Sequence, residues 1–445
     1  MINWEQNLEQ TVKNLSRLIK VESVNPPGNE MPAIQVVKEI LEAEGFERES
    51  FQILEPAAGR GNLVARLKGD SSERPLLLTG HVDVVPIERE YWSRDPFSGD
   101  VVDGYIWGRG AVDMKGFLAM FIQVFIMAKQ QGLPLKRDII LAAIADEEAG
   151  FDYGSRYLVD QHRELIDAEY AFNEIGGNTF YMNGLPVYPI QVAEKGVAWM
   201  RMTAKGEPGH ASMPHGDNAV LHLAKALDRL RLKGRLPVHI TPTVHKMLTI
   251  LSEHLPFPNG NIIGQLRNPR LASQVLNLLP DEARRLFNAM LTNTVSPTIL
   301  SAGTKTNVIP SIAQADIDCR TLPGQSPADA MAEILAVTGK GVTLETLYTS
   351  SGAEFPTDTP LYHLMTKALK NMDPNAIVSP MLMPGASDAA EYQRAGIIVY
   401  GFTPGIVPED FPLIKMAHGH DERLPISYLR SGLPALWEVV SEFCI

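Results

Sequence analysis

The stretch LLLTGHVDVVP, residues 76–86, joins an apolar run to a histidine and an aspartate. We expect residues 76–79 to form a buried strand that delivers His81 to its carboxyl end, where open α/β sheets place their sites. An imidazole that binds a metal ion needs its second nitrogen held, and Asp83 follows two residues on to hold it. A single His-x-Asp also occurs in unrelated proteins, so the interpretation depends on the neighbouring segments.

Strands and helices alternate around this stretch. The helical spacing of apolar residues predicts helices at 5–20, 31–45 and 116–131. Apolar runs predict strands at 62–67, 75–79 and 138–145. This alternation predicts an α/β fold, a three-layer sandwich with a mostly parallel sheet.

The pattern changes near Lys195. We expect strands at 196–205, 307–309, 315–320 and 342–348, and helices at 218–232 and 327–338. Residues 254–300, rich in Leu, Asn and Pro, are expected to add extra helices. The chain returns to the first domain near Glu354 and ends in a helix at 427–443. We therefore predict a catalytic domain formed by 1–193 and 354–445, with a small α+β domain inserted at 194–353.

Composition restricts the class of partner. The chain has 445 residues, too many for one ordinary core. Its net charge of −12 argues against nucleic acid or an anionic membrane, because both require basic patches. Cys319 and Cys444 make neither a disulfide framework nor a Cys-rich zinc site. No apolar run reaches about 18 residues and the N-terminus lacks an apolar signal segment, so we expect a cytoplasmic location.

Acidic residues follow other apolar runs. In ADEEAG, Asp146, Glu147 and Glu148 arrive together after an apolar strand, and Glu174 follows YAFN. Adjacent carboxylates repel one another unless cations compensate. One glutamate can therefore bind a metal ion while its neighbour accepts a proton. Taken alone, ADEEAG is equally well explained as an exposed acidic turn.

Two further segments add ligand types. In GRGAVDMKG, two glycines loosen the backbone before Asp113, and the Lys-Ser/Thr pair of a phosphate-binding loop is missing. An aspartate with both oxygens free can bridge two metal ions about 3.5–4 Å apart. AHGHDER supplies His418 and His420. Two histidines with several carboxylates favour a hydrolytic site for two metal ions.

These segments together resemble the aminoacylase and carboxypeptidase family of di-zinc metallohydrolases. That family includes carboxypeptidase S, glutamate carboxypeptidase, aminoacylase and succinyl-diaminopimelate desuccinylase, and the chain is most similar to carboxypeptidase S-like members. The resemblance runs through nearly the whole chain. It implies two zinc ions per chain, replaceable by cobalt or manganese, held by His81, Asp113, Glu148, Glu174 and His418.

The resemblance also implies roles around the metal ions. Glu147 would be the general base, and Asp83 would orient His81. The family pattern His-x-x-x-Glu selects His418, four residues before Glu422, in preference to His420. The chain has Asn173-Glu174-Ile175 where many relatives have Asp-Glu-Gly, a departure that keeps the ligand. The bond from Asp113 to Met114 would be cis.

The insert resembles the family's lid and dimerisation domain. In GEPGHASMP, His210 would reach the active site of a second subunit and bind the developing oxyanion. Asn307 and Arg320 would bind the substrate carboxylate, since arginine grips a carboxylate with two parallel hydrogen bonds. Gly385 and Ser387, in PGASDAAEY, would line the substrate pocket, with Asp388 structural. A homodimer through the lid is expected.

The reaction implied is hydrolysis of an amide with a free carboxylate, in a short peptide or an N-acyl amino acid. Two alternatives stay open. The same residues could hydrolyse an ester or a carbamoyl group, and an inactive binding protein could use the same fold. Loss of Glu147 or of a ligand would mark the inactive form, and all are present. Residues 254–300 could shape a pocket for large acyl groups.

Overall fold

The expected strand at 76–79 lies within β3 (Leu76–His81), which is buried along its whole length. Its neighbour β6 (Ile139–Ile144) is equally apolar and buried. Strands covered on both faces show continuous apolar runs of this kind. The two strands pair in parallel, with His81 opposite Ile144. This is a computed structural model that describes residues 2–445.

The chain divides into two compact units. Unit 1 comprises Met1–Val192, Phe355–Ser379 and Ser387–Ile445, and unit 2 comprises Ala193–Glu354 with Pro380–Ala386. Unit 2 thus takes in Pro380–Ala386 in addition to the insert expected at 194–353.

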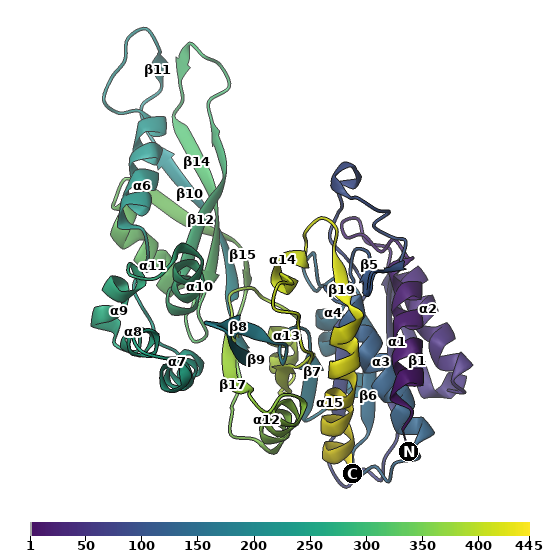
Figure 1. The fold of residues 1–445 in the computed structure, drawn as a ribbon. Helices are drawn as coiled ribbons and strands as arrows, with labels where there is room; N and C mark the ends of the chain where they lie inside the picture. The colour runs from purple at the N-terminus through teal and green to yellow at the C-terminus, as the bar shows by residue number, and fades with distance from the viewer. Residues whose placement is uncertain (1) are drawn as a thin grey trace. The chain divides into compact units, whose positions relative to one another are not determined.

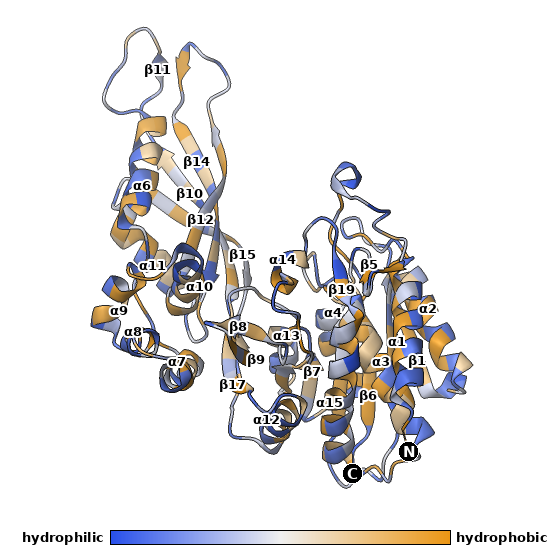
Figure 2. Cartoon of the chain, in the orientation of Figure 1, coloured by the Kyte–Doolittle hydropathy of each residue, from blue (hydrophilic) through white to orange (hydrophobic). Residues whose placement is uncertain are grey.

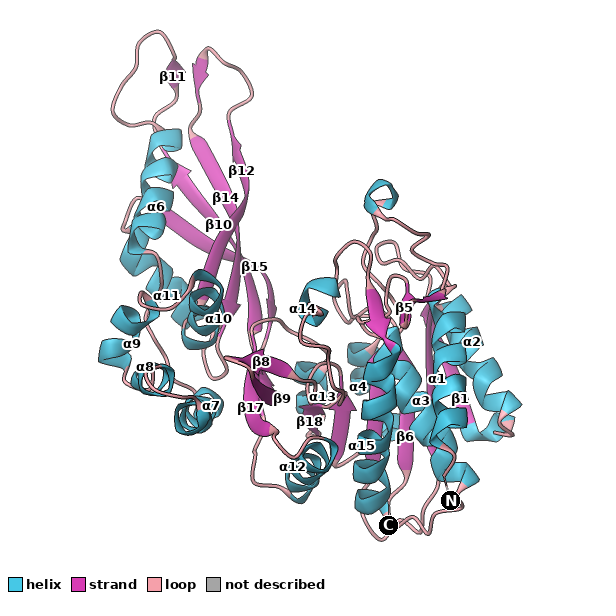
Figure 3. Ribbon diagram, in the orientation of Figure 1, coloured by secondary structure: helices cyan, strands magenta, loops and turns pink. Residues whose placement is uncertain are grey.

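A large mixed sheet has the strand order β1-β2-β6-β3-β7-β18-β9-β16, and its strands β1, β2, β6, β3, β7 and β18 lie wholly in unit 1. Its middle strands β6, β3, β7 and β18 run parallel, and the flanking pairs are antiparallel. The remaining bounds are β1 (Phe51–Ala57), β2 (Arg60–Leu67), β7 (Tyr170–Asn173), β8 (Phe180–Met182), β9 (Leu185–Glu194), β16 (Ala353–Glu354), β17 (Ile377–Met383) and β18 (Ile398–Gly401). The expected α/β fold with a largely parallel central sheet is confirmed (Figure 3).

Helices cover this sheet in two groups. One group joins α1, α2, α3, α12 and α15, and another joins α4, α5 and α13. Their bounds are α1 (Trp4–Ile19), α2 (Met31–Ala43), α3 (Lys115–Gln130), α4 (Ser155–Gln161), α5 (Arg163–Ile166), α12 (Pro360–Met372), α13 (Ala389–Arg394), α14 (Leu413–Met416) and α15 (Ile426–Cys444). Figure 2 shows the apolar character of α3, which packs directly on β3 and β6. No helix within residues 2–445 is both long and apolar enough to cross a membrane.

A separate three-stranded sheet is formed by segments that flank Asp113 and His418 in the sequence. It has the order β19-β5-β4, with bounds β4 (Val101–Val102), β5 (Tyr105–Trp107) and β19 (Arg423–Pro425). The antiparallel pairing of β19 with β5 places Arg423 opposite Trp107. The segments just before β19 and just after β5 are therefore neighbours.

Unit 2 is built on a four-stranded antiparallel sheet in the order β12-β14-β10-β15 (Figure 1). Its strands are β10 (Gly196–Lys205), β12 (Thr294–Ala302), β14 (Ile312–Thr321) and β15 (Val342–Ser350). Helices α6 (Ala219–Lys233) and α11 (Pro327–Thr338) pack on it around a buried apolar core in which alanines are mixed with larger residues such as Met200 and Met202. β11 (Gly209–His210) and β13 (Val308–Ile309) pair separately.

Residues 254–300 contain the expected extra helices, but the segment ends in a strand, which the sequence did not predict. Helices α7 (Pro242–His254), α8 (Asn259–Gln265), α9 (Pro269–Leu276) and α10 (Asp281–Leu291) are followed by strand β12. The residues of β12 include the β-branched Thr294, Val295 and Ile299, which favour strands. β12 pairs with β14 with Thr294 opposite Arg320, so pairing with a distant segment decides its structure.

Candidate metal centre

The carboxyl ends of three neighbouring strands carry three of the loops of the site. β3 ends at His81, the loop after β6 carries Glu147 and Glu148, and the loop after β7 begins with Glu174. Since β3 pairs in parallel with both β6 and β7, these ends meet at one edge of the sheet. The site therefore follows from the register of the sheet.

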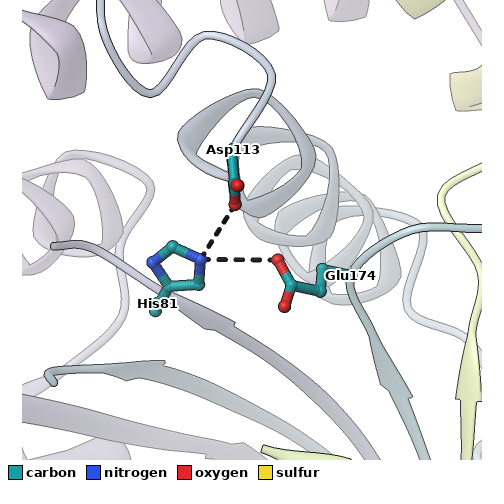
Figure 4. Close-up of side chains that lie close together, drawn as sticks. All are labelled: His81, Asp113 and Glu174. Carbon is teal, nitrogen blue, oxygen red and sulfur yellow. Dashed lines mark hydrogen bonds and ion pairs between the residues drawn. The ribbon is translucent and has the colours of Figure 1, made fainter. Parts of the chain in front are cut away.

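The first cluster comprises His81, Asp113 and Glu174. Nε2 of His81 lies 3.2 Å from Oδ1 of Asp113 and 3.4 Å from Oε2 of Glu174. Figure 4 shows all three side chains converging on this nitrogen. The imidazole of His81 is fully buried. One ligand atom from each residue lies within 4.8 Å of the others, so the three can hold one metal ion.

The second cluster comprises Asp113, Glu148 and His418. Nε2 of His418 lies 3.1 Å from Oδ2 of Asp113 and 3.2 Å from Oε2 of Glu148. Asp113 therefore presents one oxygen to each imidazole, and its peptide bond to Met114 is cis. His420 instead contacts Glu88, at 3.0 Å. The structure thus brings together the five residues expected to bind metal.

The donor set fits two divalent cations. Ligand atoms about 2.0–2.2 Å from a tetrahedral zinc ion lie about 3.3–3.6 Å apart, close to the separations in both clusters. Within residues 2–445, Oε1 of Glu148 is buried and has no hydrogen-bond partner. A buried oxygen without a partner loses its hydration at a cost, which a bound cation offsets.

Crowded charge perturbs the pKa values in both clusters. Burial and the charge of Asp113 raise the pKa of Glu174 to about 7. Burial and the charge of Glu174 raise the pKa of Glu147 well above its usual range. Hydrogen bonds to Asp113 and Glu148 raise the pKa of His418 to about 10. The clusters thus concentrate negative charge. When no cation is bound, the raised pKa values mean that protons are retained and neutralise part of this charge.

Glu147 lies beside the clusters. Its Oε2 is 3.9 Å from Nε2 of His81, and its side chain is largely buried. This contact is longer than those of the ligand residues, and the ligand atoms of Glu147, His81 and Glu148 also lie within 4.8 Å of one another. This is a suitable position for a group that exchanges a proton with a reactant.

Asp83 joins three parts of the site. Nδ1 of His81 lies 3.0 Å from the backbone oxygen of Asp83 and 3.5 Å from its carboxylate. The carboxylate accepts hydrogen bonds from the backbone N–H groups of Glu147 and Glu148, at 3.3 and 3.1 Å. It also accepts one from Asn25 at 2.9 Å. Asp83 therefore holds the loop after β6 as well as the imidazole.

Sequence reasoning assigned no role to Asn25, Arg60 or Asp146. Asn25 also donates to Asp146 at 3.0 Å, and Arg60 donates to Asp146 at 2.6 Å. Asp146 has a φ of 67°, a left-handed conformation, as do Ile175 at 58° and His418 at 59°. Non-glycine residues in that region are uncommon and concentrate at functional sites. Of these three residues, only Asp146 stood out in the sequence, as one of the acidic residues of ADEEAG.

The expected substrate-binding residues fall in both units. In unit 2, β11 and β13 pair His210 with Val308, next to Asn307, whose oxygen accepts from Ala211 at 3.1 Å. The guanidinium of Arg320 makes two hydrogen bonds to Asp318, at 2.7 and 3.0 Å. The oxygen of Gly385 accepts from the backbone of Lys195 at 3.1 Å.

Ser387 and Asp388 belong to unit 1. Oγ of Ser387 accepts a hydrogen bond from Asn173, the residue before Glu174, at 3.3 Å. Asp388 is buried and accepts a hydrogen bond from Ser155. Ser387 therefore lies close to the loop that carries one of the ligand residues.

An α/β sheet with two imidazoles gathered around a shared aspartate at its carboxyl edge, and with the buried Glu147 beside them, is typical of metal-dependent hydrolases. The sequence pattern of peptidase family M20/M25/M40 matches residues 77–442. The chain belongs to this family, which makes it an amide-bond hydrolase. The expected resemblance is confirmed.

Individual relatives agree with this assignment. Probable carboxypeptidase S-like 2 from Dictyostelium discoideum is 29% identical over 385 residues, covering 82% of this chain and 71% of that protein. The N-fatty-acyl-amino acid synthase/hydrolase PM20D1 of Homo sapiens is 29% identical over 384 residues, covering 83% and 74%. The M20 family metallo-carboxypeptidase Sso-CP2 from Sulfolobus solfataricus has the same fold, with a TM-score of 0.72, 18% identity, and coverage of 97% and 98%.

Proposed function

We propose that this protein hydrolyses the amide bond of short peptides or N-acyl amino acids that carry a free carboxylate. One observation carries the proposal: Asp113 presents its two oxygens to His81 and His418, at 3.2 and 3.1 Å, with Glu147 beside them. Such a shared carboxylate suits two neighbouring metal ions acting on one bond.

The chain's own residues divide the work of holding the ions. His81, Asp113 and Glu174 would hold one zinc ion, and Asp113, Glu148 and His418 the other. When bound, the two cations supply positive charge that polarises a carbonyl and favours the ionisation of water. We propose zinc because the donors are imidazole nitrogens and carboxylate oxygens, with cobalt and manganese as substitutes.

Glu147 would act as the general base. It accepts a proton from the attacking water and returns it to the nitrogen of the departing amine, so that one group serves both proton transfers. The burial of Glu147 and its position beside His81 and Glu148 favour this role. Asp83 would keep His81 and the loop of Glu147 in place.

Unit 2 and the loop at 385–387 would recognise the substrate. We propose that Asn307 and Arg320 bind its carboxylate, that Gly385 and Ser387 line its pocket, and that His210 binds the oxyanion from a partner subunit. Arg320 would then exchange its two bonds with Asp318 for a similar pair with substrate. The curated relatives named for N-fatty-acyl amino acids and for carboxypeptidase activity make both substrate types reasonable.

The test is hydrolysis of a mixed panel by the wild type and by Glu147→Gln, with bound zinc measured in the same samples. The panel holds dipeptides, short- and long-chain N-acyl amino acids, and matched esters and carbamoyl amino acids. We expect two zinc ions in both proteins and a fall in kcat by about 10²–10⁴ in the variant, the usual contribution of a general base. Glu169→Gln is the control, since Glu169 pairs with Arg137 just before β7, at the opposite end of that strand from Glu174.

Three results would contradict parts of the proposal. Cleavage of only the esters or carbamoyl compounds would make the substrate class wrong. An unchanged kcat in Glu147→Gln would show that Glu147 is not the general base. Absence of bound zinc in the wild type would contradict the assignment of the two clusters as zinc-binding sites.

A further inference from the structure

Glu422 is a fully buried carboxylate that lies four residues after His418. Its side-chain oxygens accept no hydrogen bond from the imidazole of His81 or of His418. Both of its side-chain oxygens point instead into the loop that ends at Asp113. The segment that carries His418 therefore holds the loop that carries Asp113.

The hydrogen bonds of Glu422 fill both oxygens. Oε2 accepts from the guanidinium of Arg109 at 2.6 Å and from the backbone of Gly110 at 3.0 Å. Oε1 accepts from the backbone N–H groups of Val112 and Asp113, at 2.7 and 3.1 Å. Such saturation leaves the carboxylate no free position for a metal ion. Its effect must pass through the residues it touches.

The backbone strengthens the same connection. The carbonyl oxygen of Glu422 accepts from Gly108 at 2.9 Å. Arg109 balances the buried negative charge, and its guanidinium lies over the ring of Trp92, 5.3 Å from the ring centre. A buried carboxylate bonded by several donors and paired with an arginine is held in one position. The loop at 108–113 is consequently wrapped around a fixed anion.

We propose that Glu422 is a positioning residue that sets the separation between Asp113 and His418. This inference rests on the proposed role of these two residues as ligands. Glu422 bonds to the backbone of Asp113, which both clusters share, and lies four residues after His418, which belongs only to the Asp113–Glu148–His418 cluster. Its loss should therefore weaken metal binding in that cluster more than in the His81–Asp113–Glu174 cluster.

The test is zinc titration of the metal-free protein against a chromophoric chelator, for the wild type, Glu422→Gln and His418→Ala. Glutamine keeps the length of the side chain but turns one acceptor into a donor that faces backbone N–H groups. His418→Ala identifies which of the two binding steps belongs to the Asp113–Glu148–His418 cluster. Glu169→Gln, which removes another arginine-bonded carboxylate of unit 1, is the matched control.

We expect Glu422→Gln to weaken the step that His418→Ala removes by about 10–100-fold, the usual effect of groups that orient ligands. The other step should weaken several-fold less, and Glu169→Gln should change neither. Equal weakening of both steps, or wild-type affinity for both, would overturn the inference. A wild type that binds no zinc would contradict the proposed function itself.

A second variant covers the case in which Glu422→Gln does not fold. Glu422→Asp keeps the charge and shortens the reach by one methylene group. Circular dichroism and urea unfolding of the metal-free protein establish folding before each titration. Selective loss of the same step in Glu422→Asp supports the inference, and two wild-type steps overturn it.

Discussion

The side-chain amide of Asn25 donates a hydrogen bond to Oδ2 of Asp83 over 2.9 Å. Both residues are buried. The same amide donates to Asp146, one residue before the proposed base Glu147. Asn25 thus connects the residue that contacts His81 with the loop that carries Glu147, from a segment that contributes no ligand.

Replacement of Asn25 by leucine should reduce kcat and zinc affinity together, by about 10–100-fold. Leucine has a similar volume but no donor, so Asp83 loses one of the bonds that fix its carboxylate. Steady-state kinetics and zinc titration of the same sample measure both effects. Gln123→Leu is a matched control, because this buried amide donates to Asn7 at 2.8 Å, away from the site. An Asn25→Leu enzyme as active as that control would contradict the prediction.

Metal binding should release protons at pH 7. Hydrogen bonds to Asp113 and Glu148 raise the pKa of His418 to about 10. Burial lowers the pKa of His81, but hydrogen bonds to neighbouring carboxylates outweigh it and raise that pKa well above 6.5. Both imidazoles therefore carry protons in the metal-free chain, and a metal ion binds only the neutral form.

The sign of the pH dependence follows. As pH falls further below these raised pKa values, more protons compete with the metal ion and the apparent affinity weakens, by about tenfold per pH unit for each proton displaced. Calorimetry in two buffers of different ionisation enthalpy counts the protons, and we expect about two per chain from the histidines, with a further fraction from Glu174, whose pKa is raised to about 7. His420→Ala should leave the count unchanged, since His420 contacts Glu88. Zinc binding without proton release would contradict the prediction.

The sequence predicted the strands whose environment leaves a strong local pattern. β3 and β6 are buried on both faces, so their residues are apolar throughout. β1 (Phe51–Ala57) was missed because it is a half-exposed edge strand that contains Pro56. β18 (Ile398–Gly401) was missed because four residues are too few to show alternation.

Three of the ligand residues, His81, Glu148 and Glu174, were found for a similar reason. Asp113 and His418 were assigned through the family resemblance, and of the supporting residues Asp83 was predicted but Asn25 was not. His81 and Glu147 stand at the ends of apolar runs, where a strand end is visible in the sequence. Asn25 and Glu422 show no such pattern. Asn25 is 58 residues from Asp83, and Glu422 is 309 residues from Asp113. Which residues meet across such separations depends on how the elements pack, and one sequence carries no local sign of it.

Arg60 should be among the most important residues for the stability of unit 1. Its guanidinium makes two hydrogen bonds of 2.8 Å to Glu30, whose carboxylate is fully buried, and a third to Asp146. Arg60→Met leaves these carboxylates buried without their counter-charge. Removal of one partner of a buried ion pair typically costs about 3–5 kcal/mol.

Urea unfolding of the metal-free protein measures this cost. Arg17→Met is the control, because Arg17 and Glu39 form an exposed pair that should contribute less than about 1 kcal/mol. Adding Glu30→Met to Arg60→Met should recover part of the loss, since it removes one isolated buried charge. If Arg60→Met and Arg17→Met lower the free energy of unfolding equally, the buried network contributes no more to stability than the exposed pair.

The proposed dimer can be tested at the edge of the unit 2 sheet. β12 is an edge strand, and its residues Ile299 and Leu300 are 59% and 65% exposed. An exposed apolar edge is a template for pairing with a second copy, and a lysine there opposes it. Ile299→Lys should therefore convert a dimer to a monomer while leaving zinc content unchanged. Because His210 is proposed to act in the partner subunit, kcat should fall with the loss of the dimer. Light scattering and kinetics over a range of protein concentrations measure both the dimer and its activity.

Leu347→Lys on β15, the other edge strand, is the matched control at 45% exposure. A wild type that is monomeric, or an Ile299→Lys variant that stays dimeric, would contradict pairing through β12. A monomeric Ile299→Lys with full activity would place the oxyanion donor within one chain.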